Sequence, residues 1–426
     1  MIEKAKKSLA NVIAKGAVHI VAGSFLLKFV SFFGSIFLVR LLSKSDYGIL
    51  SYYENIVGYL IIFMGLGLAT GLLRYVVLAE SDEKKKATFI YAVKRGTLIN
   101  ISIVFLGLFY VTAFPHPRVF VNHRIIGYLL VLSIPFLYLT NTSLSTLRAL
   151  FKNKLYSYVS FVSSALTIVF RVLGAAMSGL KTSVFFQLGA SVISAFFSTC
   201  LILNILFSRC MKVKLDKSFT SSFNNFSLQI MLTNALWTVF MLNDMFLLGQ
   251  LTGSETTIAD YKIANVIPAN LSILTSSISI FVSPYFTKKE NEKDFTWVKK
   301  KFRTVLLSTS IIMGTAAIFC FVFAEPLISF IYGKNYLSAI PIMRILLLAS
   351  FVNNGVRASI ANILSSIGKQ KINLIIAGIG IILQIVLNVI FIPKNGATAV
   401  AIISVIVYFA MTALLIVAWR IESRRF

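Results

Sequence analysis

The chain has 426 residues, of which 57% are hydrophobic and only 13% charged, and its mean hydropathy is +0.84. A soluble domain carries about 25% charged residues, so the composition excludes a soluble globular protein and predicts a polytopic helical membrane protein. The net charge of +26 would favour nucleic acid in a soluble protein. Here the basic residues lie in short loops between apolar runs, so nucleic-acid binding is excluded.

Residues 1–15 precede the first apolar run and predict a basic amphipathic helix on a membrane surface. Leu9 and Val12 share an apolar stripe, while Lys4 and Lys7 lie elsewhere on the helix. This pattern is typical of a segment that lies against anionic lipid.

Apolar runs of spanning length then recur along the whole chain, and they predict about twelve membrane-spanning helices. The predicted spans are roughly 16–39, 49–78, 94–114, 125–146, 155–177, 183–207, 223–249, 258–284, 303–323, 341–366, 372–392 and 397–419. The expected fold class is therefore an all-α integral membrane protein.

The spans divide into two halves of six, which share a weak internal similarity. Asp46-Tyr47 and Asp260-Tyr261 each follow a Leu-Leu pair and a short polar turn. Repeats of six spans share one topology, so we expect two six-helix bundles around a central cavity that holds the substrate. The expected domains are the helix at 1–15, the bundles 16–207 and 223–419, a cytoplasmic linker at 208–222, and a cytoplasmic tail at 420–426.

Basic residues are distributed unequally between the two sides of the predicted spans. One set of loops contains the Lys84–Lys86, Arg209–Lys217 and Lys288–Arg303 clusters, whereas the opposite loops contain few basic residues. Positive residues concentrate in cytoplasmic loops. Both termini are therefore expected in the cytoplasm.

Sequence motifs for catalysis are missing from the chain. No nucleotide-binding P-loop or hydrolase motif occurs, and no predicted loop is long enough to build an extramembrane active site. Cysteine and histidine residues form no metal-ligand pattern. Gly65, Gly67 and Gly71 favour close helix packing over a nucleotide loop.

Three cations, Lys28, Arg171 and Arg357, lie inside apolar runs. A charge at bilayer depth costs about 2.5–3.5 kcal/mol, so such residues usually face a cavity or a partner. Lys28 shares a helical face with Ser31 and Ser35, which favours a wet cavity, with a buried ion pair as the alternative. Arginine suits phosphate because its planar fork donates two parallel hydrogen bonds.

Other charged residues lie nearer the ends of the spans. Arg344 lies near the outer end of the tenth span, and Glu54 near the outer end of the second. Arg40 and Arg74 can either contact substrate or extend to the interface. The candidate substrate-binding set is Lys28, Arg171, Arg357, Arg344, Arg40, Arg74 and Glu54.

The eighth and tenth spans carry further polar residues. Asn265, Ser272, Ser276, Ser279 and Ser283 form a polar stripe, and Pro268 and Pro284 lie near its two ends. Asn353 and Asn354 precede Arg357. The prolines predict either a hinge that frees backbone carbonyls or an ordinary kink.

Asp244 is a lone carboxylate near the outer end of the seventh span. A carboxylate at that depth either binds a coupling cation or neutralises Lys28 or Arg171.

Three segments resemble the polysaccharide-repeat flippases of the MOP superfamily. They are FLVRLLSKSDYGILSYYENIVGYLIIFMGLGLATGLLRYV, NDMFLLGQLTGSETTIADYKIANVI and AEPLISFIYGKNYLSAIPIMRIL. The resemblance implies a flippase, not an enzyme, which moves an undecaprenyl-pyrophosphate-linked oligosaccharide such as an O-antigen or capsule unit to the outer leaflet by alternating access. It implies as partners the lipid-linked oligosaccharide, membrane lipids, and the polymerase and glycosyltransferases of polysaccharide biosynthesis.

The related lipid II flippases imply a sodium site as well. Asp244 matches the carboxylate of the seventh span, and Gln384, Asn388, Val400 and Ser404 occupy similarly spaced positions. Asn388 stands where that branch has a second carboxylate, so Na⁺ and H⁺ both stay open as the coupling ion.

Three alternatives are left open by the sequence. The first is a cation-coupled multidrug exporter of the same fold, but such exporters mainly move cationic drugs and favour an acidic cavity. A membrane glycosyltransferase or polymerase lacks an obvious site here, and a scaffold without transport does not explain the buried cations.

Overall fold

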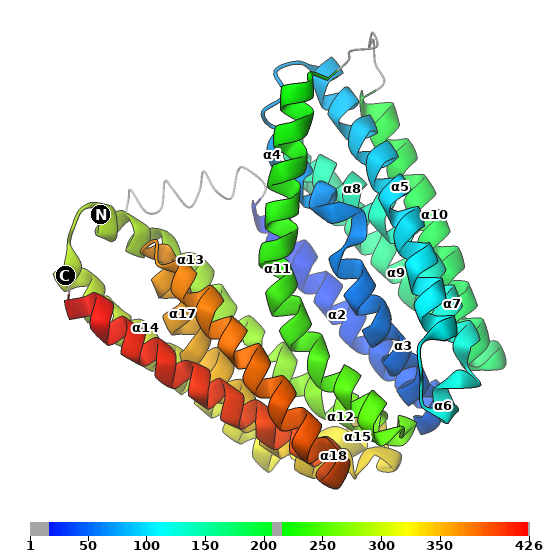
Figure 1. Ribbon diagram of the computed structural model, residues 1–426, viewed down its shortest axis with the longest axis vertical. Coiled ribbons are helices and arrows are strands. Elements are labelled where there is room, and N and C mark those ends of the chain that lie inside the picture. The colour runs from blue at the N-terminus through cyan, green and yellow to red at the C-terminus, as the bar shows by residue number, and fades with distance from the viewer. Residues whose placement is uncertain (1–16, 207–214, 425–426) are drawn as a thin grey trace. The chain divides into compact units, whose positions relative to one another are not determined.

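The computed structural model describes residues 17–206 and 215–424, and all regular structure in these ranges is helical (Figure 1). The segments 1–15 and 208–214, in which an amphipathic helix and part of the linker are predicted, lie outside the described residues. The chain folds into two compact units. The first unit holds the described residues up to Asp46, together with Tyr53–His116 and Val121–Ala235, and the second holds Tyr47–Tyr52, Pro117–Phe120 and Leu236 onward.

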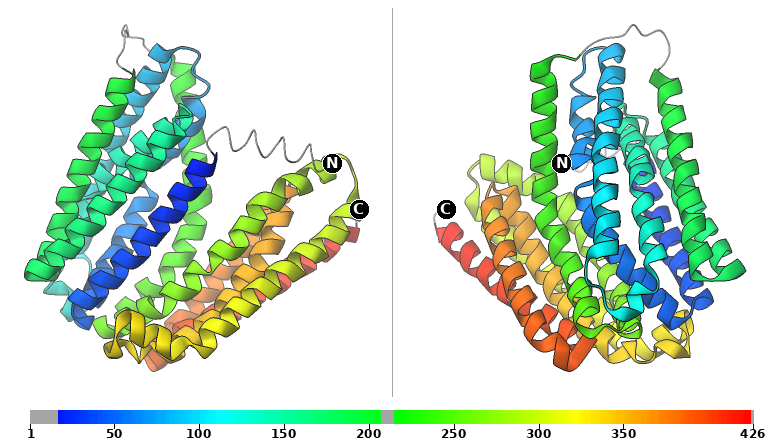
Figure 2. Two further views of the ribbon diagram at one scale, coloured as in Figure 1. Left: turned by 180° about the vertical axis from the view of Figure 1, so that it is seen from behind. Right: turned by 45° about the vertical axis from the view of Figure 1, so that its right-hand side comes forward.

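Helices of the first unit lie in the first half of the chain. They are α2 (Ala17–Leu41), α3 (Lys44–Ile62), the 3₁₀ turn η1 (Met64–Gly67), α4 (Leu68–Tyr75), α5 (Asp82–Ala113), α6 (Arg118–Val121), α7 (Arg124–Leu132), α8 (Ile134–Ala149), α9 (Asn153–Ser178) and α10 (Leu180–Leu206). Short pieces of α3 and α6 belong to the second unit. Long helices such as α9 and α10 run side by side in this unit (Figure 2).

Helix α11 (Lys217–Thr252) is divided between the two units after Ala235. The second unit continues with α12 (Glu255–Asn270), α13 (Ser272–Asn291), α14 (Phe295–Val322), α15 (Ala324–Tyr332), η2 (Lys334–Tyr336), α16 (Ala339–Ser350), the π-helix η3 (Phe351–Arg357), α17 (Ala358–Ser366) and α18 (Gln370–Arg424). The division between the compact units therefore falls within helix α11. The cytoplasmic linker expected at 208–222 stays a prediction.

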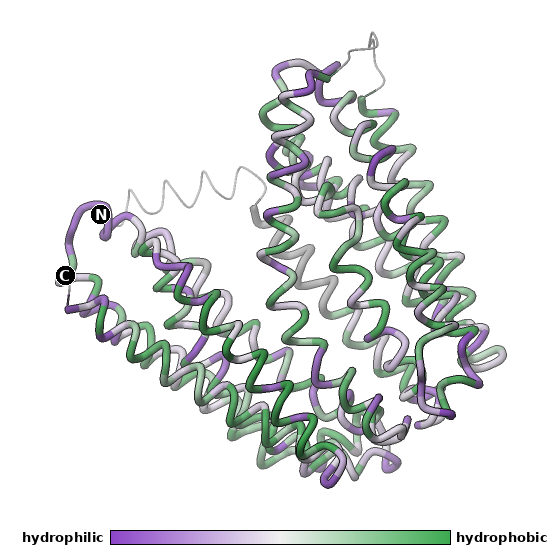
Figure 3. The backbone as a smooth tube through the Cα atoms, viewed as in Figure 1, coloured by the Kyte–Doolittle hydropathy of each residue, from purple (hydrophilic) through white to green (hydrophobic). Residues whose placement is uncertain are grey.

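Spans in the described part of the chain agree with the expected all-α membrane fold. Nine helices there are long and apolar enough to cross a membrane, and α3 with α4 form a further span that is bent by 44°. The 55-residue α18 is two spans, because the backbone breaks at Gly396 (φ 53°, ψ −135°) and about 20 residues suffice to cross a bilayer. With α2, this makes twelve spans, and hydrophilic residues gather at the helix ends (Figure 3).

The bend between α3 and α4 depends on glycine. Gly65 and Gly67 have positive φ, and the Gly65 N–H donates to the Asn100 side chain at 3.1 Å. A Cβ at Gly71 would meet Ser227 and the Phe223 ring of α11. The predicted close helix packing is confirmed.

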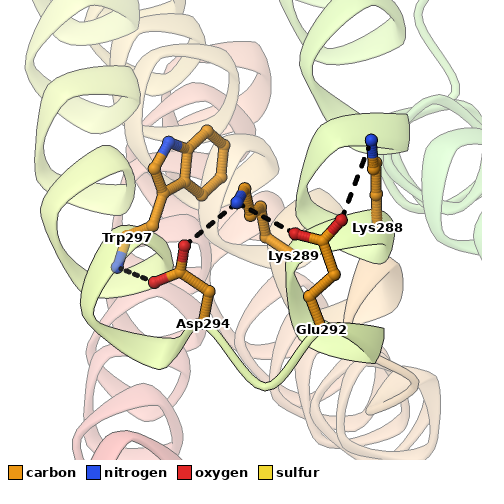
Figure 4. Close-up of polar contacts among 5 residues, drawn as sticks. All are labelled: Lys288, Lys289, Glu292, Asp294 and Trp297. Atoms are coloured by element: carbon orange, nitrogen blue, oxygen red, sulfur yellow. Dashed lines mark hydrogen bonds and ion pairs between the residues drawn. The ribbon is translucent and has the colours of Figure 1, made fainter.

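The turn between α13 and α14 is bound by ion pairs (Figure 4). Lys289 donates to Asp294 at 3.0 Å and lies 2.9 Å from Glu292. Hydrogen bonds from Lys289 lower the pKa of both carboxyl groups. Asp294 also caps α14, because its side chain accepts from the Trp297 N–H at 3.1 Å.

The core of the second unit is formed mainly by α14, α17 and α18. Phe302 stacks on Trp419 with ring centroids 3.8 Å apart, and Ile360 and Val407 are fully buried beside them. This core fixes the C-terminal half of α18 against α14, and thereby positions the polar residues of α18 that face α11.

Gly71→Val tests the close packing of α4 on α11. The added side chain would clash with Phe223, so we expect the stability of the folded protein to fall by about 1–3 kcal/mol. Thermal unfolding of the detergent-purified chain measures this change. Gly189→Val on α10 is the matched control, because a Cβ at Gly189 meets nothing within 4 Å. Equal melting temperatures for the two variants would contradict the packing.

Candidate functional site

Asp244 is the centre of a buried polar cluster in the second unit. Its Oδ1 accepts from Gln384 Nε2 at 2.9 Å and from Asn388 Nδ2 at 2.8 Å. Its Oδ2 accepts from Ser404 Oγ at 3.1 Å and from the Tyr261 hydroxyl at 3.3 Å. The carboxylate is therefore held by four neutral donors from α12 and α18, and no cation pairs with it in the part of the chain that the structure describes.

This cluster contains the residues that the sodium-site resemblance implies. Asp244 is 9% exposed, Gln384 2%, and Asn388 is fully buried. Val400 is buried, and its carbonyl accepts from Ser404 at 3.0 Å. The structure brings all five together, although the sequence separates the two helices that carry them by more than a hundred residues.

The cluster fits a small hard cation by its oxygen content, because such ions prefer oxygen ligands. The carboxylate, the Val400 carbonyl, the Ser404 hydroxyl and two amides supply oxygen. Both amides turn nitrogen toward Asp244, yet Asn388 Oδ1 is buried without a hydrogen-bond partner. Amide oxygen and nitrogen exchange by a 180° rotation, which would bring the orphaned oxygen to the cation.

A cavity of about 230 Å³ opens beside this cluster within the second unit. Asp244, Tyr261 and Ser404 line one part of it, and Trp237, Asn353 and Tyr408 line another. Asn265, Ser272 and Pro268 of the predicted eighth-span stripe also reach it, whereas Ser276 is exposed away from it. The cavity joins the acidic cluster to a second polar group.

Arg357 belongs to that second group. Its guanidinium carbon lies 4.7 Å from the Trp237 ring centroid and 5.9 Å from that of Tyr408, and Nε donates to Asn353 Oδ1 at 2.6 Å. These three partners line the cavity. No carboxylate pairs with Arg357 within the described ranges. Two aromatic rings and one amide oxygen stabilise its positive charge.

The π-helix η3 positions Arg357. A π-helix leaves backbone carbonyls without regular partners and is common at functional sites. The Gly355 carbonyl accepts from Thr309 Oγ1 of α14 at 2.8 Å, and Ser359 donates to the same Thr309 at 2.9 Å. Hydroxyl groups of a neighbouring helix thus satisfy the backbone that the widened turn exposes.

A chain of hydrogen bonds continues from Asn353 to α12. Asn353 donates to Asn354 at 3.3 Å, Asn354 to Ser350 at 3.0 Å, and Ser350 to the Pro268 carbonyl at 2.7 Å. The asparagines predicted beside Arg357 therefore connect the arginine to the proline-containing helix.

Arg171 lies in the first unit, where its side chain forms an ion pair with a glutamate. Its Nη2 lies 2.7 Å from Glu54 Oε1, and the two side chains are 20% and 29% exposed. The sequence predicted both as substrate-binding residues and suggested Asp244 as a partner of Arg171. The structure corrects that pairing, because Glu54 neutralises Arg171 and Asp244 is held by neutral donors.

The other predicted substrate residues are divided between the two units, with Arg344 in the second and Lys28, Arg40 and Arg74 in the first. Arg344 is on the same segment as Arg357 but 13 residues away, about 20 Å along a helix axis. Arg74 is exposed and lies over the Phe226 ring at 4.7 Å, and Arg40 is exposed at the end of α2. Lys28 is helical, but its side chain lies outside the described residues, so its role stays a prediction.

Three residues of the site were not predicted as ligands: Trp237, Tyr261 and Tyr408. Tyr261 belongs to the repeated Asp-Tyr pair, which was interpreted only as a sign of duplication. Trp237 and Asp244 are seven residues apart on α11, and Ser404 and Tyr408 four apart on α18, so helical spacing places each pair on one face. Such spacing would have suggested Trp237 and Tyr408 as members of the site.

Comparison with known proteins assigns the chain to a family. A family model described as "Polysaccharide biosynthesis protein" matches residues 37–341, and the chain belongs to this family. An uncharacterized membrane protein of Methanocaldococcus jannaschii is 23% identical over 415 residues, which cover 88% of this chain and 78% of that relative.

Solved structures define the fold. An inward-facing multidrug resistance MATE transporter of the MOP superfamily matches with a TM-score of 0.79 and 14% identity, over 94% of this chain and 95% of its own. The lipid II flippase MurJ, in an inward closed conformation, matches with a TM-score of 0.75 and 17% identity, over 95% and 89%. A MOP transporter from Pyrococcus furiosus, described as having a binding pocket of reversed polarity, matches at 0.66 with 13% identity, over 97% and 95%. The predicted MOP fold is confirmed.

The ion pair between Glu54 and Arg171 predicts strong coupling between the two side chains. Glu54→Gln or Arg171→Met alone leaves one half-buried charge without its partner, so each should destabilise the protein by about 1–3 kcal/mol. The double variant removes both charges and should lose less than the sum. Thermal unfolding of the four proteins measures the coupling; strictly additive losses would contradict a stabilising ion pair.

Thr309→Val tests the support of the π-helix. Valine keeps the shape of threonine but leaves the buried Gly355 carbonyl with a weaker donor, Ser310 at 3.4 Å. We expect a loss of about 1–3 kcal/mol in thermal unfolding. Thr304→Val is the control on the same helix, because Thr304 is exposed and donates only to Lys300 of its own helix. A control variant as unstable as Thr309→Val would refute the assignment.

Proposed function

We propose that this chain is a flippase that moves an undecaprenyl-pyrophosphate-linked oligosaccharide from the inner to the outer leaflet of a bacterial cytoplasmic membrane. It acts by alternating access, with both termini in the cytoplasm, and as a transporter rather than an enzyme. The oligosaccharide is an O-antigen, capsule or related repeat unit. Glycosyltransferases supply it, and a polymerase consumes it.

One observation carries this proposal: Arg357 is a half-buried arginine without an acidic partner among the described residues, and the groups that hold it line a cavity. Cation–π contacts of roughly 0.5–2 kcal/mol each help to offset its desolvation but leave its net charge intact. A pyrophosphate supplies the missing negative charge and accepts two parallel hydrogen bonds from the planar fork. Family membership in polysaccharide biosynthesis supports a lipid-linked sugar as the cargo.

Asp244 is the coupling residue in this proposal. Na⁺ or H⁺ binds at the carboxylate, where Gln384, Asn388, Ser404 and the Val400 carbonyl surround it. Inward movement of the cation would make the cycle an antiport. An inside-negative potential favours export of an anion by about 2.3 kcal/mol per charge per 100 mV.

Charge distinguishes this function from multidrug export on the same fold. In this proposal the coupling cation neutralises Asp244 in the cavity wall, whereas Arg357 keeps an uncompensated positive charge next to the same cavity. A cationic drug would meet that charge unfavourably, and an anionic head group would be stabilised by it.

Reconstitution into liposomes with a fluorescent undecaprenyl-pyrophosphate-linked oligosaccharide tests the proposal. Arg357→Ala removes the guanidinium, so its flipping rate should be lower than that of the native chain by about tenfold or more. Arg357→Lys keeps the charge without the planar fork and should retain part of the rate. Asp244→Asn should remove the response to an imposed Na⁺ or H⁺ gradient. Accessibility of the sugar to an external glycosidase measures the rate.

Arg303→Ala is the matched control, because Arg303 is an exposed arginine of the second unit outside the cavity. Folding of every variant is checked by its thermal unfolding profile. Full flipping by Arg357→Ala would refute the phosphate role. Transport of a cationic dye in place of the lipid-linked sugar would establish the exporter.

A further inference from the structure

A second cavity lies on the second unit, away from Arg357 and Asp244. It measures about 610 Å³ and runs between α14 and α16, within the range of roughly 300–1,000 Å³ of small-molecule sites. Gly314, Ala317 and Phe321 line it from α14, and Arg344, Leu348 and Phe351 from the other side. The walls are apolar apart from Arg344. We call this cavity the Arg344 groove.

Small side chains on α14 create the space. A Cβ at Gly314 would touch only the Phe351 ring, at 3.4 Å, and Ala317 follows one turn later. Ile318 and Leu348 at the groove are 66% and 51% exposed. Since α14 and α16 span a membrane, these exposed apolar residues meet lipid chains. The groove has the chemistry of an acyl-chain site.

Arg344 is the anomalous residue in this wall. Its guanidinium carbon lies 5.3 Å from the Phe321 ring centroid, and its Nε is buried without a hydrogen-bond partner. No carboxylate pairs with it within residues 17–206 and 215–424. A cation that faces lipid in this way needs an anion that lipid can provide.

The position of Arg344 matches the depth of a lipid phosphate. It lies five residues into α16, about 8 Å from the helix start, which is within reach of the interface for an arginine side chain. A phosphodiester accepts two parallel hydrogen bonds from the planar fork of a guanidinium. The chain of the same lipid then follows the apolar walls past Gly314.

We propose that the Arg344 groove is a specific site for one anionic phospholipid, whose phosphate binds Arg344 and whose acyl chain fills the space between α14 and α16. Charge complementarity selects an anionic over a zwitterionic lipid, because the guanidinium has no other counter-charge. The lipid is not the transported cargo, since Arg344 and Arg357 are about 20 Å apart along their segment, and the cavity beside Arg357 shares no lining residue with the Arg344 groove. The proposal rests on the membrane fold alone and does not depend on the flippase activity.

Native mass spectrometry of the full chain in detergent tests the site. Dioleoyl phosphatidylglycerol and dioleoyl phosphatidylcholine are the probes, because they share chains and differ in charge. We expect one phosphatidylglycerol retained in preference and a higher melting temperature in its presence. Arg344→Met should reduce its retention about tenfold and abolish the preference, and Arg344→Lys should fall between.

Gly314→Leu fills the groove without changing its charge, so it should reduce retention of both lipids. Gly378→Leu is the matched control on α18, where a Cβ meets nothing within 4 Å, and Arg303→Met is the control for loss of an exposed arginine. These two should bind as the native chain does. Equal retention of both lipids by the native chain would overturn the proposal, as would equal losses in Arg303→Met and Arg344→Met. Unchanged binding by Gly314→Leu would overturn it even if Arg344→Met failed to fold.

Discussion

The cost of holding an ionised group away from water determines how the polar residues of this chain are arranged. Arg171 is compensated by an opposite charge, Asp244 by four neutral hydrogen-bond donors, and Arg357 by an amide and two aromatic rings. Each arrangement meets the same desolvation cost, which amounts to several kcal/mol per ion. They differ in the charge that remains for a ligand. An ion pair leaves none, whereas neutral partners leave the full charge in place.

This difference separates structural from functional cations. Arg171 with Glu54 presents a nearly neutral unit, so an anionic ligand would have to displace a carboxylate at 2.7 Å to reach it. Arg357 presents its charge without such competition, and the π-helix exposes a backbone carbonyl that α14 satisfies through Thr309. Short π-helical segments are common at functional positions. In the second unit, Arg357 therefore combines the charge, the neighbouring cavity and the unusual backbone that the proposed function requires.

Sequence reasoning predicted the spans well, because about twenty consecutive apolar residues permit little besides a spanning helix. It also grouped Asp244 with Gln384, Asn388 and Ser404, but through a resemblance rather than through physics. It could not predict the partner of Arg171, because a contact across 117 positions depends on how helices pack. The π-helix was equally inaccessible, since Phe351–Arg357 has no composition that distinguishes it from an α-helix. Local periodicity fixes which faces are polar, whereas tertiary packing decides which polar groups meet.

The proposed coupling between cation and anion has a physical route through two helices. Trp237 and Asp244 lie on one face of α11, about 10 Å apart along its axis, and Tyr408 lies one turn from Ser404 on α18. Phe240 connects them, with ring centroids 5.4 Å from Trp237 and 5.7 Å from Tyr408. In the proposed cycle, a cation at Asp244 would compete with the Ser404 hydroxyl for the carboxylate. Any resulting shift of α18 against α11 would displace the two rings that hold Arg357. Coupling requires such a shared element with two arrangements, and in the second unit α11 and α18 are the helices that both sites share.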